Sequence, residues 1–360
     1  MMNGNKGEWS ELYTLLKLAA DGKLYAADGS INKIENIYYD ILQIIRKQKD
    51  DNWKYIRNGK IKIVSEKTGE IVDEISISEF KTNAELLLEA IQNVKTKKGS
   101  FEVKNVESFI TKIKCVTTKA KSTDKADIFL IVHDAKVGSD PKLGFSIKSQ
   151  LGSPSTLVNA SNATNFIYKL SGHKLTDKEK EVFHSFKYFK DKFAYLDKLQ
   201  AKVSFDKVSS KIFNANLMLI DTQMPAILAV IVENFYRGRA STISELMNLC
   251  IDKNVCNVSE DNKQIFYDYK IKEFMTNCAL GMMPGHLWSG KYDATGGYII
   301  VKEDGDVLCY HIYNRNEFRE YLYKNTKLDT PSTGKHGFGT IEEVGGNQYL
   351  KLNLQIRFIK

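Results

Sequence analysis

The chain has 360 residues, with 52 Lys plus Arg against 44 Asp plus Glu, and a formal net charge of +8. Hydrophobic residues make up 42% and charged residues 27%, a globular composition that excludes disorder and collagen-like repeats. No stretch approaches the roughly 18 consecutive apolar residues of a membrane-spanning helix, and the first residues lack the apolar run of a secretory signal. We therefore expect a cytoplasmic protein with no membrane partner.

The first third of the chain predicts helices over residues 8–20, 31–48 and 78–94, from apolar residues at helical spacing. Residues 94–125 then hold nine Lys and three acids, a local net charge of +6. Of the 52 cationic residues, 45 are Lys and only 7 are Arg. The net positive charge of the chain is therefore explained equally well by an AT-rich genome and by a polyanionic partner. The local concentration of charge favours an electrostatic guide for nucleic acid.

Two strands are predicted next. Residues 127–133 form a nearly continuous apolar run, which is typical of a buried strand, and residues 144–150 alternate apolar and polar side chains. A turn signal, Gly138-Ser139-Asp140-Pro141, separates them, so we expect a hairpin. Residues 153–165 follow as a polar stretch rich in amides and hydroxyls.

The remaining pattern is first helical and then β-rich. A capping box at Thr176 and Glu179 opens a largely helical stretch to about residue 200, and further helices are predicted over residues 225–232 and 243–250. From about residue 284 we expect strands, which include a hairpin of residues 297–301 and 307–311 and one alternating strand over 350–358. These shifts suggest three ranges: a catalytic core (1–172), a mainly helical region (173–280) and a β-rich C-terminal region (281–360).

Two further patterns carry little chemistry. The five Cys, at 115, 250, 256, 278 and 309, form no Cys-x-x-Cys pair, so we expect reduced thiols and neither disulfides nor a zinc site. Gly285 to Lys291 have the spacing of a phosphate-binding loop. Tyr292 replaces the required hydroxyl residue, however, and no apolar strand precedes the loop, so we discount a nucleotide site.

The sharpest chemical pattern is Asp127 at the start of one strand and Ser146-Ile147-Lys148 in the next. Phosphodiester hydrolysis needs a divalent cation and an activated water, and Mg²⁺ prefers oxygen ligands such as a carboxylate or the main-chain carbonyl of Ile147. Lys148 and Gln150 share a strand face with residue 146, so Lys148 can orient or deprotonate the water while Gln150 assists. Taken alone the pattern is weak, since a strand with a Lys on its wet face is usually only a sheet edge.

The layout resembles the PD-(D/E)xK nuclease core, in which an acid is followed by a spacer and then acid-x-Lys. Ser146 stands where that pattern has its second acid. We expect Glu11 to supply the missing carboxylate as a second metal ligand with Asp127, while Glu8, one helical turn earlier, remains an alternative.

Longer blocks resemble the HpaII-type restriction endonuclease family, in the same order from residue 7 to 358. They are Gly7-Glu8-Trp9-Ser10-Glu11-Leu12-Tyr13, Gly144-Phe145-Ser146-Ile147-Lys148-Ser149-Gln150-Leu151-Gly152, Thr156-Leu157-Val158-Asn159-Ala160-Ser161, Thr295-Gly296-Gly297-Tyr298, Asp329-Thr330-Pro331-Ser332-Thr333-Gly334 and Leu352-Asn353-Leu354-Gln355-Ile356-Arg357-Phe358. The resemblance implies an α/β fold with a PD-(D/E)xK-like core, a central mixed sheet flanked by helices, plus a helical region and a β-rich C-terminal region.

The same resemblance implies a type II restriction enzyme that cuts double-stranded DNA with Mg²⁺ at a short palindrome and leaves 5′-phosphates. The family prototype reads CCGG. A palindrome favours a homodimer on DNA, although a monomer that nicks each strand in turn stays open. The cell that carries such an enzyme would also carry a cognate DNA methyltransferase, which need not bind this chain.

Three segments are candidates for DNA contact. Amides pair with adenine edges and Arg reads guanine, while hydroxyls and amides also bind phosphates. The candidates are the polar stretch after the catalytic strand, the Arg pair in Tyr236-Arg237-Gly238-Arg239, and a C-terminal glycine loop. Their residues are Asn159, Asn162, Thr164, Asn165, Arg237, Arg239, Lys335 and His336.

Two other functions are alternatives to the nuclease. One is a sequence-specific DNA-binding protein whose nuclease site has decayed, for which Ser146 is the evidence. The other is a DNA methyltransferase, which would want a glycine-rich cofactor loop and an Asn/Asp-Pro-Pro-Tyr/Phe segment. None of the five Pro residues is adjacent to another, which argues against it.

Overall fold

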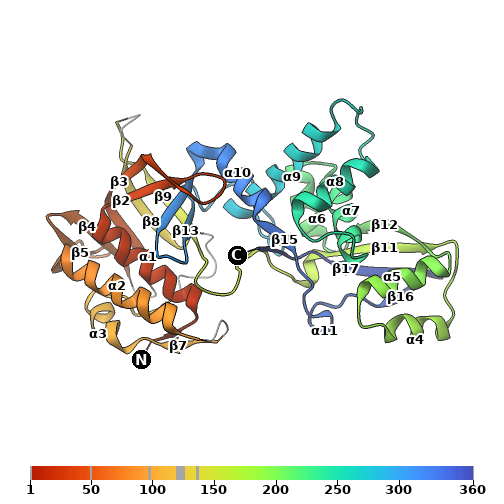
Figure 1. The fold of residues 1–360 in the computed structure, drawn as a ribbon, viewed down its shortest axis with the longest axis horizontal. Coiled ribbons are helices and arrows are strands. Elements are labelled where there is room, and N and C mark those ends of the chain that lie inside the picture. The colour runs from red at the N-terminus through yellow and green to blue at the C-terminus, as the bar shows by residue number, and fades with distance from the viewer. Residues whose placement is uncertain (1, 49–50, 96–98, 119–125, 135–137, 360) are drawn as a thin grey trace. The chain divides into compact units, whose positions relative to one another are not determined.

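The structure is a computed structural model that describes residues 2–48, 51–95, 99–118, 126–134 and 138–359. The chain divides into two compact units (Figure 1): unit 1 is formed by residues 1–155 and 292–321, and unit 2 by residues 156–291 and 322–359. The boundaries of these units differ from those of the three ranges expected from the sequence. Residues 281–360, expected as one region, contribute to both unit 1 and unit 2.

Unit 1 is built on a mixed nine-stranded sheet with the order β2-β14-β13-β9-β8-β3-β4-β5-β6. Strand β2 also pairs with β3, so β2, β14, β13, β9, β8 and β3 close into a ring. The expected mixed α/β class is confirmed, but the expectation of a plain open sheet is wrong. The long strand β3 causes the closure, since its first half pairs with β2 and its second half with β8 and β4.

The strands of the large sheet are β2 (Lys23–Ala27), β3 (Lys33–Lys47), β4 (Asn52–Asn58), β5 (Lys60–Ser65), β6 (Ile71–Ser76), β8 (Ile128–His133), β9 (Lys142–Ser149), β13 (Gly297–Val301) and β14 (Val307–His311). Two short strands, β1 (Asn3–Gly4) and β7 (Phe101–Glu102), pair separately. The helical elements are α1 (Lys6–Asp21), α2 (Ile77–Asn93), α3 (Lys104–Lys112) and η2 (Ile312–Asn314), after which α10 (Arg315–Lys324) begins. The predicted hairpins β8–β9 and β13–β14 are both confirmed as antiparallel pairs.

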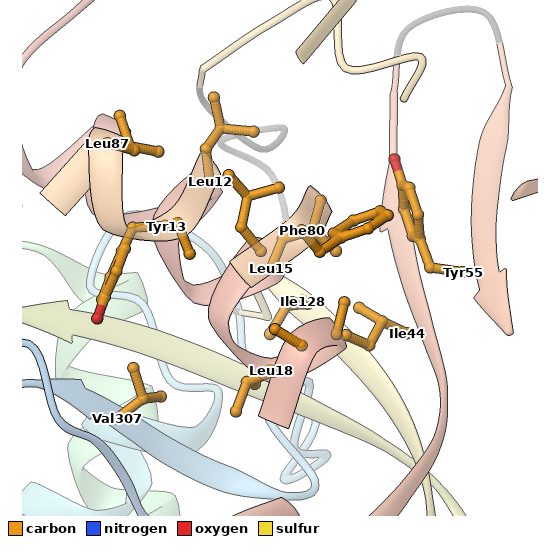
Figure 2. Packing of buried hydrophobic residues seen from close by; sticks show 14 of the residues in the cluster. Leu12, Tyr13, Leu15, Leu18, Ile44, Tyr55, Phe80, Leu87, Ile128 and Val307 are labelled. Atoms are coloured by element: carbon orange, nitrogen blue, oxygen red, sulfur yellow. The ribbon is translucent and has the colours of Figure 1, made fainter. Parts of the chain in front are cut away.

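Helix α1 supplies much of the core of unit 1. Asn5 and Glu8 form a capping box at its start, and Gly22 ends it in the left-handed conformation at φ 70°. Leu12 and Leu15, which are fully buried, point toward the strands and toward α2 in Figure 2. The predicted helices over 8–20 and 78–94 are confirmed as α1 and α2.

The helix predicted over residues 31–48 is wrong, because this segment is strand β3. Its Ile and Tyr residues are spaced like a helix face, but β-branched side chains pack well on a pleated sheet. The strand also changes partners along its length, so its buried positions do not follow a simple period of two.

Unit 2 holds two small sheets, β10-β18-β15 and β12-β11-β17-β16. Its strands are β10 (Thr156–Val158), β11 (Asn165–Ser171), β12 (Lys202–Val208), β15 (Thr326–Leu328), β16 (Ile341–Val344), β17 (Asn347–Asn353) and β18 (Ile356–Phe358). Its helical elements are η1 (Asn162–Thr164), α4 (Asp177–Ser185), α5 (Phe189–Lys198), α6 (Lys211–Ile220), α7 (Met224–Tyr236), α8 (Ile243–Lys253), α9 (Lys263–Leu280) and α11 (Thr333–His336).

Most of the sequence expectations for unit 2 hold. The capping box at Thr176 opens α4, and α7 and α8 cover the helices predicted over 225–232 and 243–250. The single strand predicted over 350–358 is instead two strands, β17 and β18, in different sheets. The break falls where Leu354 donates its backbone N–H to Thr164 and Gln355 accepts from Asp329.

The five Cys all lie within the described ranges, and none of them forms a disulfide there. Within the described ranges no single helix has the length and apolarity to cross a membrane. Helices α6 and α7 pass that test only when joined, and they are bent by 111°.

Candidate active site

The start of β8 brings Asp127 against strand β9. The backbone N–H of Asp127 donates to the carbonyl of Phe145 at 2.8 Å, and its carboxylate Oδ2 accepts from the backbone N–H of Ile147 at 2.7 Å. The hydrogen bonds that the described residues make to this carboxylate go to Oδ2.

Ser146 links this carboxylate to Lys148. Its hydroxyl donates to Asp127 Oδ2 at 3.2 Å and accepts from Lys148 Nζ at 2.9 Å. Ser146 is only 3% exposed, while Asp127 and Lys148 are half-buried. Three of the predicted catalytic residues are therefore joined in one line of hydrogen bonds.

Side chains alternate along β9, so the core residues and the candidate site residues of this strand lie on opposite faces of the sheet. Phe145 and Ile147 point into the hydrophobic core, so Ser146 and Lys148 lie on the opposite face. Lys148 Nζ sits 5.0 Å from the ring centroid of Tyr298, which is directly opposite Ser146 on β13. Tyr298 thereby packs the side of the Lys148 side chain.

Gln150 lies one residue beyond β9, where its backbone N–H donates to the carbonyl of Val301 at 2.9 Å. In the described part of the chain, no hydrogen bond joins its side chain to Lys148 or Asp127. Its predicted assistance to the water therefore remains a prediction.

Helix α1 contacts β9 and β3, the two strands that flank β8. The hydroxyls of Ser10 and Ser149 hydrogen-bond at 2.7 Å, which ties α1 to β9. The next residue, Glu11, lies 3.8 Å from Arg46 on β3. Because β8 lies between β9 and β3, residues 10 and 11 bridge the two strands that flank it.

The alternative carboxylate, Glu8, is engaged elsewhere. It accepts from the backbone N–H of Asn5 at 2.9 Å as part of the capping box. Glu11 has a side chain that is 13% exposed and lies 3.8 Å from Arg46, and its role as the second carboxylate stays a prediction.

The donor set fits a magnesium ion better than a transition metal. Within the described residues no three His, Cys, Asp or Glu converge as a ready-made metal cage. Magnesium is commonly held by one or two carboxylates and keeps several of its waters. Asp127, the main-chain carbonyl of Ile147 and Glu11 are oxygen donors of that kind, and their convergence on one ion stays a prediction.

The polar stretch 153–165 divides into exposed and buried members. Asn159 and Asn162 are exposed, whereas Thr164 and Asn165 are at most 4% exposed. Asn353 on β17 donates to the carbonyl of Ser161 at 2.8 Å and to Asn165 Oδ1 at 2.7 Å. Thr164 and Asn165 are thus engaged in holding the loop, and the exposed pair is better placed to meet DNA.

The two predicted arginines have different surroundings. Arg237 hydrogen-bonds Glu233 at 2.9 Å and Asp197 at 3.0 and 3.1 Å, and it stacks over the ring of Phe193. Arg239 is exposed and donates to the amide oxygen of Asn234 at 2.8 Å. Arg239 is therefore the stronger candidate for reading a base, and the role of either in DNA contact remains a prediction.

Lys335 and His336 lie on the short helix α11 of unit 2. Lys335 is exposed, and the carbonyl of His336 accepts from Asn165 Nδ2 at 2.9 Å. The same Asn353 that holds Asn165 accepts from the phenol of Tyr236 through its carbonyl at 3.0 Å. Three predicted DNA-contact segments, distant in sequence, therefore meet around Asn353.

Three residues of these constellations escaped the sequence reasoning: Arg46, Tyr298 and Asn353. Arg46 is one of only seven Arg, and that scarcity was the signal that could have drawn attention to it. The basic segment 94–125 is described only in part, since residues 96–98 and 119–125 lie outside the described ranges.

The structure thus joins a carboxylate, a hydroxyl and a lysine on two adjacent strands, the residue types that the sequence predicts for a nuclease site. The family model of the HpaII restriction endonuclease matches residues 5–358. The chain belongs to this family, and its class is therefore the type II restriction endonucleases. It is 43% identical over 357 residues to the type II restriction enzyme HpaII of Haemophilus parainfluenzae, across 99% of each chain. No solved structure matches it.

Proposed function

We propose that the chain hydrolyses both strands of duplex DNA at a short palindrome in the presence of Mg²⁺ and leaves 5′-phosphate ends, with a PD-(D/E)xK-like core at β8 and β9. The observation that carries this proposal is the line Asp127–Ser146–Lys148 on adjacent strands, with Lys148 Nζ 2.9 Å from the Ser146 hydroxyl. Within this proposal the target CCGG comes from the family prototype, and a palindrome favours a homodimer on DNA. A methyltransferase of matching specificity in the same cell is part of the proposal, as is a cytoplasmic location.

Each residue of the line has a separate role. Asp127 and Glu11 would hold the metal ion, which when bound would neutralise charge that builds on the scissile phosphate. Lys148 orients the attacking water or takes a proton from it at Nζ. The hydroxyl of Ser146, which accepts a hydrogen bond from Nζ, fixes the position of that nitrogen. The aromatic ring of Tyr298 excludes water from one side of the lysine.

Plasmid cleavage tests this proposal directly. Purified protein is incubated with plasmid DNA with and without Mg²⁺, and the ends of any fragments are mapped. We expect discrete fragments with Mg²⁺, and their loss in Asp127→Ala and Lys148→Ala. Lys142→Ala is the matched control, because Lys142 is exposed at the start of the same strand β9. Full cleavage by Asp127→Ala would overturn the site, and the absence of discrete fragments across metals and salts would overturn the activity.

One observation favours a second candidate, a DNA-binding protein with a decayed site. Ser146 provides no carboxylate at the position where the PD-(D/E)xK pattern has one. This alternative predicts salt-dependent binding to DNA without cleavage in Mg²⁺, so the same plasmid assay combined with a binding titration separates the two.

A further inference from the structure

Three helices of unit 2 end around an open groove. Helices α5, α7 and α8 end at Lys198, Tyr236 and Lys253, and the groove beside their ends has a volume of about 620 Å³. That size is typical of a ligand site, which commonly measures about 300–1,000 Å³. Six of its lining residues are charged, three of each sign: Arg237, Arg239, Lys253, Asp197, Glu233 and Asp252.

Four of these residues neutralise one another in the wall of the groove. Arg237 donates to Glu233 at 2.9 Å and to Asp197 at 3.0 and 3.1 Å. Lys253 Nζ lies 3.4 Å from the other carboxylate oxygen of Glu233. This network leaves one cation and one carboxylate of the six to meet a ligand.

The remaining cation, Arg239, is held in a defined position. Its Nη1 donates to the amide oxygen of Asn234 at 2.8 Å, and its backbone N–H donates to the carbonyl of the same residue at 3.1 Å. Asn234 is 4% exposed, and its Nδ2 donates to the carbonyl of Val230 at 2.9 Å, which fixes the orientation of the amide. A guanidinium has five N–H donors, and the bond to Asn234 uses one of them. Arg239 is exposed and lines the groove, so its other donors can meet a planar ligand.

The remaining carboxylate, Asp252, lies in the last turn of α8 and also lines the groove. It is exposed, and among the described residues it forms no ion pair or hydrogen bond. An ionised carboxylate only accepts hydrogen bonds. The groove therefore presents a fork of donors together with an acceptor.

The electrostatics of the groove disfavour a phosphate. Its three cations and three carboxylates give no net charge. The C-terminus of a helix carries about half a negative charge, and three helices end here. A phosphate clamp needs the opposite, an excess of cations that release counter-ions. A base edge carries no net charge and offers donors as well as acceptors, so it suits the mixed lining better.

We propose that this groove reads the major-groove edge of one G·C pair, with Arg239 donating to guanine O6 and N7 and Asp252 accepting from the cytosine amino group. The inference rests on the proposed cleavage of duplex DNA and names residues of unit 2 that select its target. A G·C pair presents two adjacent acceptors followed by a donor. An A·T pair places the adenine amino group between its two acceptors, so a guanidinium fork finds no bidentate site there.

Binding to short labelled duplexes tests this readout, with Ca²⁺ in place of Mg²⁺ so that binding is measured apart from cleavage. The duplex carries the site that plasmid cleavage maps, which is CCGG under the proposed function. Each guanine in turn is replaced by 7-deazaguanine, which lacks N7, and each cytosine by N4-methylcytosine, whose methyl group covers the major-groove side of the amino group. We expect the wild-type affinity to fall about tenfold at one guanine and at its paired cytosine.

Two variants assign each loss to its residue. Arg239→Ala should bind the natural and the 7-deazaguanine duplexes alike, and Asp252→Ala should bind the natural and the N4-methylcytosine duplexes alike. Lys198→Ala and Asp261→Ala are the matched controls, because both residues are exposed in unit 2 and lie outside the lining of the groove. Both controls should keep the losses of wild type.

Three results would overturn the inference. The first is a wild-type chain that cuts plasmid DNA into discrete fragments but binds all modified duplexes as tightly as the natural one. The second is an Arg239→Ala or Asp252→Ala chain that keeps the losses of wild type. The third is an Arg239→Ala chain that binds every duplex more weakly by the same factor, with a salt slope reduced by about one, since this is the signature of a phosphate contact. A wild-type chain that cuts no plasmid DNA would instead overturn the proposed function, and this inference with it.

Discussion

Replacing Ser146 by Ala removes the hydroxyl that joins Lys148 to Asp127. The Ser146 oxygen is 2.9 Å from Lys148 Nζ and 3.2 Å from Asp127 Oδ2, and the side chain is 3% exposed. Ala fits the same space, so the fold should remain. The change leaves Lys148 free to rotate and leaves the direct bond from the Ile147 N–H to Asp127 intact.

The size of the effect follows from those contacts. A hydrogen bond to a charged group contributes about 1.5–3 kcal/mol. If that energy is used to place Lys148 in the transition state, its loss lowers kcat by about tenfold to about a hundredfold. KM for DNA should change little, because Ser146 is too buried to contact the backbone of DNA.

Single-turnover cleavage of a plasmid or an oligonucleotide duplex at saturating Mg²⁺ measures this effect. Lys148→Ala should be slower than Ser146→Ala, since it removes the group that Ser146 only positions. Ser146→Thr keeps the hydroxyl and should recover part of the rate. A Ser146→Ala rate equal to wild type would refute the reasoning, and so would a rate as low as that of Lys148→Ala.

Other substitutions test stability. Gly297→Ala should destabilise by at least about 3 kcal/mol in urea unfolding, because residue 297 has φ 104° and an added Cβ would lie 2.0 Å from the carbonyl oxygen of Tyr310; a loss below 1 kcal/mol would contradict this. Burial lowers the pKa of His311 to about 4, so the folded state binds its proton less tightly than the unfolded state. Stability should therefore fall by about 2 kcal/mol between pH 7 and pH 5, and His311→Phe should remove this part of the pH dependence; an unchanged pH dependence in the variant would count against it. Asn353→Leu should cost about 2–4 kcal/mol and weaken DNA binding, since it leaves acceptors of Ser161 and Asn165 unpaired; unaltered unfolding would show that the Asn353 cluster is dispensable.

Local signals predicted much of the fold, and long-range pairing decided the rest. The capping boxes at Asn5 and Thr176 and the apolar spacing of α1 act within a few residues, so the sequence could place those helices. Strand β3 was missed because its buried face depends on which strand pairs with each half. No local pattern shows that β2 will return to pair with β3 and close the ring.

The candidate site shows the same division. The patterns of residues 127–133 and 144–150, with the turn signal between them, predicted the hairpin that carries Asp127, Ser146 and Lys148, because the two strands are adjacent in sequence. The partners of Glu11 and of Asn165 lie 35 and 188 residues away, at Arg46 and Asn353, and spacing carries no information about them. Sequence also could not show that Arg237 is already bound by two carboxylates.

The excess of Lys takes on a more definite role beside the site. Many lysines are neutralised by carboxylates, such as Lys174 and Lys180, which share Glu343 and hold its pKa low. Lys148 on β9 instead lies over the ring of Tyr298, and in the described ranges no carboxylate comes within ion-pair distance of its ammonium group. An aromatic ring holds a cation without cancelling its charge. Positive charge therefore persists on the strand that carries Ser146, where a phosphate approaching Asp127 needs it. Genome bias explains why residue 148 is a Lys but not why it lies over an aromatic ring and away from a carboxylate.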